Sequence, residues 1–200
     1  MNYLKTLVVV SVLFFAGCAS NPMNVTKNTE VSPTSADEAQ VVFMRSSFLG
    51  SAINASLFDV THGEPVFIGI IANDTKVPYK TTPGKHTFMV VSEAADFLEA
   101  DIVAGKNYYS IVTPRMGAWK ARFSLWPISN DPAAKFTTGS KDFSEWQEET
   151  FIAETTEKAN AWYQKNKDSV TKKQAKYWPV WLKKSAEDLD KRTLKQEDGL

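Results

Sequence analysis

Short apolar runs separated by turn signals constrain the fold of this 200-residue chain more than any other feature. Between residues 40 and 128 such runs recur about every ten residues. Val41–Arg45 and Val66–Ile71 are typical, and Pro83-Gly84 suits the centre of a type II turn, whose second position requires a positive φ. Helical spacing is not evident before residue 140. The pattern predicts a mainly β domain over residues 40–130, built as an antiparallel β-sandwich.

The pattern changes after a linker at residues 131–140. Residues 141–198 contain one proline, Pro179, and no glycine, and their apolar residues recur at helical spacing. Asp168-Ser169 can end one helix and cap the next, and Pro179 disfavours helical geometry at the residue before it. The sequence therefore predicts a C-terminal α-helical extension that packs on the sandwich or lies beside it.

Charge is divided unevenly along this extension. Residues 142–157 carry six acidic and no basic residues, whereas residues 165–184 carry seven lysines and one aspartate. One interpretation is an antiparallel helix pair whose opposite charges attract. Another is a basic helix that lies on anionic headgroups or binds an anionic envelope polymer. A protein partner is the third. The contact residues would be Trp178, Trp181, Lys183 and Lys184.

Residues 18–39 are rich in Ser, Asn, Thr, Pro and Glu and contain almost no large apolar residue. Such a segment buries too little surface to offset its ordering entropy, so we expect a flexible tether. The whole chain has 23 basic and 23 acidic residues. This balance argues against general nucleic-acid binding, which depends on many phosphate contacts.

Residues 1–17 have the pattern of a signal peptide. Lys5 precedes an apolar run from Leu7 to Ala16, which is too short for a helix that must cross a hydrocarbon core of about 30 Å. The run ends directly before Cys18, the one cysteine of the chain. An ordinary secretory signal with an incidental cysteine is the alternative interpretation.

Ala16-Gly17-Cys18 resembles the lipobox of bacterial lipoproteins, with Phe15 in place of the usual leucine. The resemblance implies cleavage before Cys18 and attachment of acyl chains such as palmitate to that residue, and two or more chains anchor a protein firmly. Ala19 follows the cysteine instead of the aspartate that retains lipoproteins in the inner membrane. The resemblance therefore implies the outer membrane, on its periplasmic side.

Two further motifs occur within the predicted sandwich. The first is Thr82-Pro83-Gly84-Lys85-His86, and about twenty residues later follows Ala104-Gly105-Lys106-Asn107-Tyr108-Tyr109. Together they resemble uncharacterised bacterial lipoproteins with a PEGA-like, prealbumin-like β-sandwich domain. The resemblance covers about residues 40–115 and implies a fold but no biochemical activity.

No residue pattern predicts a catalytic site, a metal site or a cofactor. His62 and His86 are too few for a three-ligand zinc site without further ligands, and no Gly-x-Ser-x-Gly motif occurs. Glu99 and Asp101 are expected on one solvent-facing side of a strand. The sequence predicts a non-enzymatic binding or scaffolding module with an envelope protein or polymer as partner. A carrier or chaperone for a small apolar ligand or client, and a cell-wall hydrolase, remain as alternatives.

Overall fold

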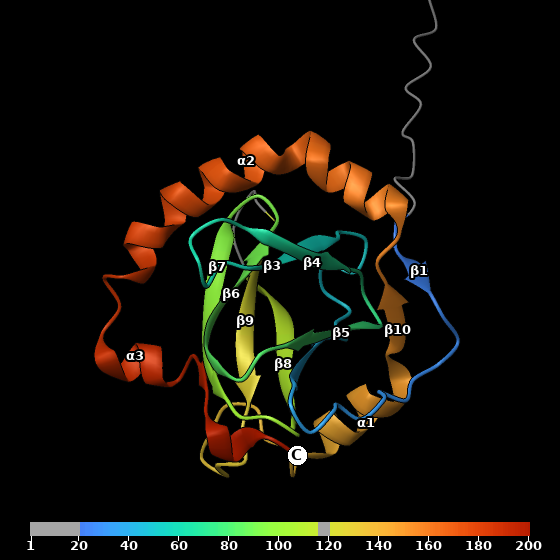
Figure 1. The fold of residues 1–200 in the computed structure, drawn as a ribbon, viewed down its shortest axis with the longest axis vertical. Coiled ribbons are helices and arrows are strands. Elements are labelled where there is room, and N and C mark those ends of the chain that lie inside the picture. The colour runs from blue at the N-terminus through green and yellow to red at the C-terminus, as the bar shows by residue number, and fades with distance from the viewer. Residues whose placement is uncertain (1–20, 116–120) are drawn as a thin grey trace, which may run out of the picture.

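The computed structural model describes residues 21–115 and 121–200. They form two β-sheets packed face to face, with a long helix across the outer face of one sheet (Figure 1). The predicted mainly β sandwich with a C-terminal helical region is thus confirmed. The expected signal peptide over residues 1–17 and the expected acylation site at Cys18 lie outside the described residues.

The larger sheet has six strands in the order β1-β10-β5-β2-β8-β9. Their bounds are β1 Asn24–Val25, β10 Phe151–Glu154, β5 Thr75–Thr81, β2 Ala39–Arg45, β8 Asn107–Arg115 and β9 Arg122–Ile128. The smaller sheet has the order β11-β7-β6-β3-β4. Its strands are β11 Thr193–Leu194, β7 Ala95–Ile102, β6 Gly84–Val91, β3 Ala55–Asp59 and β4 Val66–Ile71. Most pairs are antiparallel, whereas β2–β8, β10–β5 and β11–β7 are parallel.

Strand β2 lies at the centre of the larger sheet and is buried along its whole length. Its inward residues pack against the other sheet, where the Phe43 and Phe88 rings meet edge to face at 5.2 Å. Its outward residues Val42 and Met44 join a second apolar cluster with Phe143 of α1, the helix Lys141–Glu149. Coverage on both faces explains why this strand reads as a continuous apolar run instead of an alternating one.

Helix α2, Glu157–Trp181, covers the outer face of the smaller sheet and curves around the sandwich (Figure 1). The side chain of its N-cap residue, Thr156, accepts a hydrogen bond from the backbone N–H of Ala159. Tyr163 stacks on Phe67 with ring centroids 5.2 Å apart. The helical extension therefore packs on the sandwich.

The predicted helix break at Asp168-Ser169 is wrong, because α2 runs through it without interruption. Both residues are exposed, and Val170 beside them is buried against the sheet. Apolar contacts on either side of the pair thus outweigh its local preference for a helix end. Pro179 lies in the last turn of α2, and the helix ends two residues later.

Residues 21–39 are not the flexible tether that their composition predicts. Strand β1 pairs with β10, and Met23 is only 6% exposed. The Sδ atom of Met23 accepts a hydrogen bond from the backbone N–H of Ile70 at 3.3 Å. A segment with few apolar residues is ordered here because it pairs with the edge of an existing sheet and needs no core of its own.

The predicted helical extension over residues 141–198 also contributes a strand to each sheet, β10 and β11. It further contains α3, Ala186–Asp190, and the 3₁₀ helix η1, Gln196–Asp198. The expected antiparallel pair of an acidic and a basic helix is not formed. Strand β10 separates α1 from α2, and Figure 1 shows the two helices on different sides of the sandwich.

Candidate functional site

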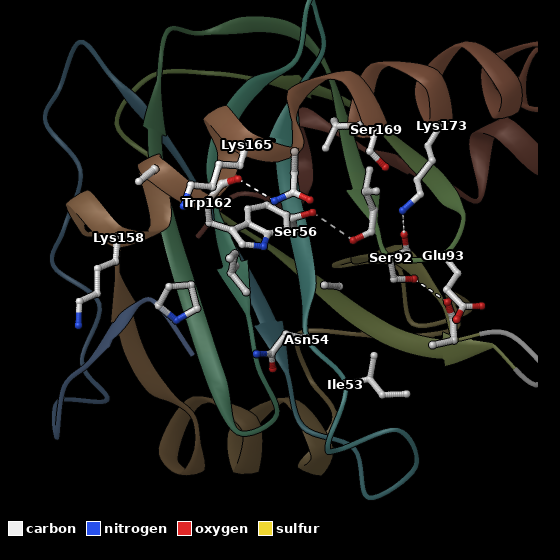
Figure 2. A pocket seen from close by; sticks show the side chains of 18 residues that line it. Ile53, Asn54, Ser56, Ser92, Glu93, Lys158, Trp162, Lys165, Ser169 and Lys173 are labelled. Atoms are coloured by element: carbon white, nitrogen blue, oxygen red, sulfur yellow. Dashed lines mark hydrogen bonds between the residues drawn. The ribbon is translucent and has the colours of Figure 1, made fainter. Parts of the chain in front are cut away.

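A groove of about 790 Å³ lies between α2 and the ends of strands β3, β4 and β6 (Figure 2). We call it the α2 groove. Its apolar part is formed by Ile53, Ala55, Ile70, Val91, Trp162 and Val170. Lysines line it as well, at positions 158, 165 and 173. A cavity of this size and mixed lining is typical of sites for small organic ligands.

Helix α2 supplies one complete face to the groove. Lys158, Trp162, Lys165, Ser169 and Lys173 follow one another at steps of three or four residues, which places them on one side of a helix. Figure 2 shows these side chains along the helix, with Asn54 and Ile53 below them. Ala159 and Tyr163 lie on the side of the helix next to this face, where they are buried against the sandwich.

The groove carries a positive charge. Lys158 and Lys165 are exposed, and Lys173 donates a hydrogen bond from Nζ to the backbone carbonyl of Ser92. Among the described lining residues Glu93 is the one carboxylate. Three ammonium groups beside an apolar lining favour a ligand with both an apolar part and an acidic group.

Several polar side chains of the groove already bond to the backbone. The Ser56 hydroxyl donates to the Val91 carbonyl at 3.2 Å, and the Ser92 hydroxyl donates to the Ala121 carbonyl at 2.7 Å. Neither serine has a histidine or carboxylate base as its hydrogen-bond partner, so neither is arranged as an activated nucleophile. Paired carboxylates, which glycoside hydrolysis requires, are not formed by the described lining residues.

The N-terminal segment enters the fold at one end of this groove. Pro22 lines the groove, and its carbonyl accepts a hydrogen bond from the hydroxyl of Thr156, the N-cap residue of α2. The chain that leads back toward Cys18 therefore starts beside the first turn of α2. The composition of residues 18–39 gave no signal for this contact, because it joins residues that are 134 positions apart.

The structure separates the four residues predicted as membrane or partner contacts. Trp181 is 2% exposed, and its Nε1 atom donates to Glu99 Oε1 at 3.3 Å. The Trp178 ring meets Phe97 edge to face at 5.0 Å. Both rings serve the contact between α2 and β7, so Trp181 cannot reach a membrane. Lys183 and Lys184 line a smaller hollow together with Trp181 and two arginines.

Glu99 and Asp101 are not the solvated pair that strand alternation predicts. The C-terminal segment, through β11, runs along this edge of β7. Besides the bond from Trp181 to Glu99, the Gln196 side chain donates to Asp101 at 3.0 Å. The Glu99 carboxylate thus binds α2 to the sandwich, and the Asp101 carboxylate binds the C-terminal segment.

His86 takes part in a buried polar cluster away from the groove. Its Nδ1 lies 3.2 Å from Asp59 Oδ2, and its Nε2 lies 2.9 Å from the Thr82 carbonyl, to which it can only donate. The hydrogen bond with Asp59 raises the pKa of His86 against the effect of burial. Burial raises the pKa of Asp59, but hydrogen bonds from His86 and Thr61 outweigh it, so this pKa lies below its usual value. With both ring nitrogens engaged, His86 is a structural ion-pair partner and not a general base.

Among residues 21–115 and 121–200 no group of three His, Cys, Asp or Glu side chains is placed to hold a metal ion. No helix in the same ranges is both long and apolar enough to span a membrane. Comparisons with protein-family models, with curated proteins and with solved structures returned no match. The resemblance to PEGA-like lipoproteins therefore stays a prediction from the sequence motifs.

Proposed function

We propose that this chain is a lipid-anchored, periplasm-facing envelope protein whose folded part is a non-enzymatic binding module. The α2 groove is its binding site, and the ligand is an elongated amphiphile with an acyl-like body and an acidic group. The observation that carries the proposal is the row of lysines from α2 beside an apolar lining in one cavity of about 790 Å³. Burial of the ligand's methylene groups would supply affinity, at about 0.8 kcal/mol each.

The position of the N-terminal segment supports this assignment. Cys18 is three residues before Asn21, so acyl chains on Cys18 would lie at most roughly 11 Å of extended chain from the described domain. Pro22, the next residue, lines the groove. An acylated protein would hold the groove close to the membrane surface, where amphiphiles are concentrated.

The other functions considered from the sequence have less support. A carrier with its ligand between the sheets would need an open sandwich, but that space is filled by buried residues such as Phe43, Leu57, Phe88 and Leu125. A cell-wall hydrolase would need a second carboxylate near Glu93. A scaffolding role would not account for the α2 groove, because a scaffold requires no ligand cavity.

A fatty-acid binding assay tests the proposal. A soluble version that starts at residue 18 and carries Cys18→Ser keeps every described residue and can be titrated with a fluorescent long-chain fatty acid. Lys165→Glu should weaken binding about tenfold, because an ion pair with the acidic group becomes a repulsion. Lys167→Glu is the matched control, since Lys167 lies on α2 outside the lining and should change affinity less than twofold.

Titration with a neutral monoacylglycerol distinguishes the contribution of the lysines from that of the apolar lining. Its binding should be insensitive to Lys165→Glu but should fall with Trp162→Ala, which removes apolar lining. Circular dichroism melting would establish that each variant is folded. If neither ligand binds at low salt, the groove is not an amphiphile site and the proposal is wrong.

A further inference from the structure

A second hollow, of about 440 Å³, lies between the C-terminal end of α2 and the β8–β9 hairpin. We call it the cationic pocket. Its lining includes four cationic side chains, which come from three separate parts of the chain: Arg115, Arg122, Lys183 and Lys184. Tyr177 and Ser185 add two hydroxyl groups. This pocket shares no lining residue with the α2 groove.

The two arginines oppose each other across the hairpin. Arg115 of β8 is the direct antiparallel partner of Arg122 in β9, so both side chains leave the sheet on the same face. Like charges at directly opposite positions destabilise a strand pair. Lys183 and Lys184 add further positive charge to the same hollow. An anion bound there would remove this repulsion.

The nearby carboxylates do not balance the four cations. Asp96 lines the pocket, but it accepts a 2.6 Å hydrogen bond from Arg192, and both side chains of that ion pair are buried. Asp188 is the remaining acid of the lining. Among the described residues no salt bridge joins any of the four cations to a carboxylate.

Trp181 lines the pocket and is buried, with its ring against the Arg192 side chain behind it. The Arg192 guanidinium lies 4.4 Å from the Trp126 ring centroid and 5.3 Å from that of Trp181. Lys184 Nζ lies 5.5 Å from the centroid of the same Trp181 ring, which places this ammonium group beside a fixed aromatic surface. A cationic site built on buried aromatic side chains loses less conformational freedom when it binds a ligand.

We propose that the cationic pocket binds a phosphomonoester. A phosphate group carries close to two negative charges at neutral pH and offers three acceptor oxygens. These oxygens match the paired donors of arginine and the hydroxyl groups of Tyr177 and Ser185. The proposal is independent of the α2 groove and of acylation at Cys18.

The ester has two potential sources, which share this chemistry: a free phosphorylated metabolite and the headgroup of a phosphomonoester lipid. Val180 lines the pocket and is 61% exposed, and Leu182 close by in the chain is 60% exposed. Such side chains beside the pocket would favour a lipid, because they could enter the interface next to its headgroup.

The experiment uses the soluble Cys18→Ser version and two probes of one headgroup chemistry. Glycerol phosphate is titrated while backbone amide shifts are followed by NMR. In parallel, sedimentation with phosphatidylcholine vesicles is measured with and without phosphatidic acid. Saturable shifts at the pocket residues identify a free ester, and binding only to vesicles with phosphatidic acid identifies the lipid. Either result supports the proposal.

A charge-matched pair of variants decides whether the pocket itself is responsible. Arg122→Gln with Lys183→Gln should weaken binding tenfold or more, because hydrogen bonds to charged groups are lost. Lys167→Gln with Lys172→Gln removes the same net charge from α2, outside the pocket lining, and should change binding less than twofold. If both double variants lost affinity equally, the binding would be due to diffuse electrostatics and the proposal would be wrong. The absence of binding to either probe would also overturn it.

Discussion

Buried cations on two strands of the sandwich donate hydrogen bonds to backbone carbonyls of neighbouring segments. Arg45 donates to the carbonyls of Gly50 and Ile53, each at 2.6 Å, and so closes the loop between β2 and β3. Burial lowers its pKa to about 10, although the charge of Asp74 opposes this effect. Lys76 donates to the carbonyls of Thr29 and Gln147 at 2.6 and 2.7 Å, and burial lowers its pKa to about 8. Single side chains thus fix loops that have few apolar contacts of their own.

The buried pair of His86 and Asp59 should make stability depend on pH. Because the pKa of His86 is raised in the folded state, its contribution is fully present below its unfolded pKa of about 6.5 and is lost as the pH rises through the raised value. The pKa of Asp59 is lowered, so its contribution is present above about pH 3.8 and is lost as the pH falls further. The pair therefore stabilises the fold most between these limits.

We expect His86→Gln to lower the free energy of unfolding by about 1.5–3 kcal/mol at pH 5.5, the usual contribution of a hydrogen bond between charged groups. The difference from wild type should be smaller at pH 9, because wild-type His86 loses its charge as the pH rises through its raised pKa. Urea denaturation at both pH values measures this. His62→Gln is the control, because His62 is exposed. A difference that stays constant with pH would mean that His86 is not charged in the folded protein.

At the scale of elements, the N-terminal segment acts as part of the larger sheet. The methyl group of Met23 fills the space over Gly69, where an added Cβ atom would lie 2.8 Å from it. Thr26 and Asn28 exchange backbone hydrogen bonds with Ile152 of β10. This segment thus covers one edge of the sandwich and positions Pro22 at the groove.

Met23→Ala should destabilise the protein by about 2–5 kcal/mol, because it leaves a cavity between β4 and β5. Val25→Ala, on a side chain that is 42% exposed, should cost no more than about 0.5 kcal/mol. Thermal or urea unfolding measures both. Equal and negligible effects would instead fit the flexible tether expected from composition.

Much of the fold could be predicted from local sequence, and the site could not. The strands containing Val41–Arg45 and Val66–Ile71 follow from their apolar runs. Strand β10 was missed because Ile152 and Ala153 also fit a helical pattern, and only pairing with β5 and β1 selects the extended form. The α2 groove and the cationic pocket join segments distant in sequence, so neither produces a local motif.

For the whole molecule, the position of Pro22 determines how far the domain can stand from a membrane. If the predicted tether were a flexible coil of about 20 residues, the domain could stand roughly 25 Å from the membrane. The ordered segment leaves only Ala19 and Ser20 between Cys18 and Asn21. Acylation of Cys18 would therefore hold the first turn of α2 close to the lipid surface.

The distance between the first turn of α2 and the lipid surface can be measured by fluorescence quenching. Acylated protein in vesicles that contain a headgroup-linked quencher should lose most of the fluorescence of a dye on Glu157, the first residue of α2. A dye on Asp131 is the control, since its neighbour Asn130 bonds to Glu197 near the C-terminus, on the side of the sandwich away from α2 (Figure 1). Equal quenching at both positions would contradict close attachment through the end of α2.

The C-terminal segment has a consequence for the order of events during folding. Leu194 is fully buried, the Tyr108 hydroxyl donates to the Gln196 carbonyl, and Leu200 exchanges backbone hydrogen bonds with Asn107. A chain still threading through a ribosome or a translocation pore cannot make these contacts. Residues 194–200 can therefore complete the edge of β7 and bond to β8 only after this segment is free, so these contacts form after the rest of the chain has been made.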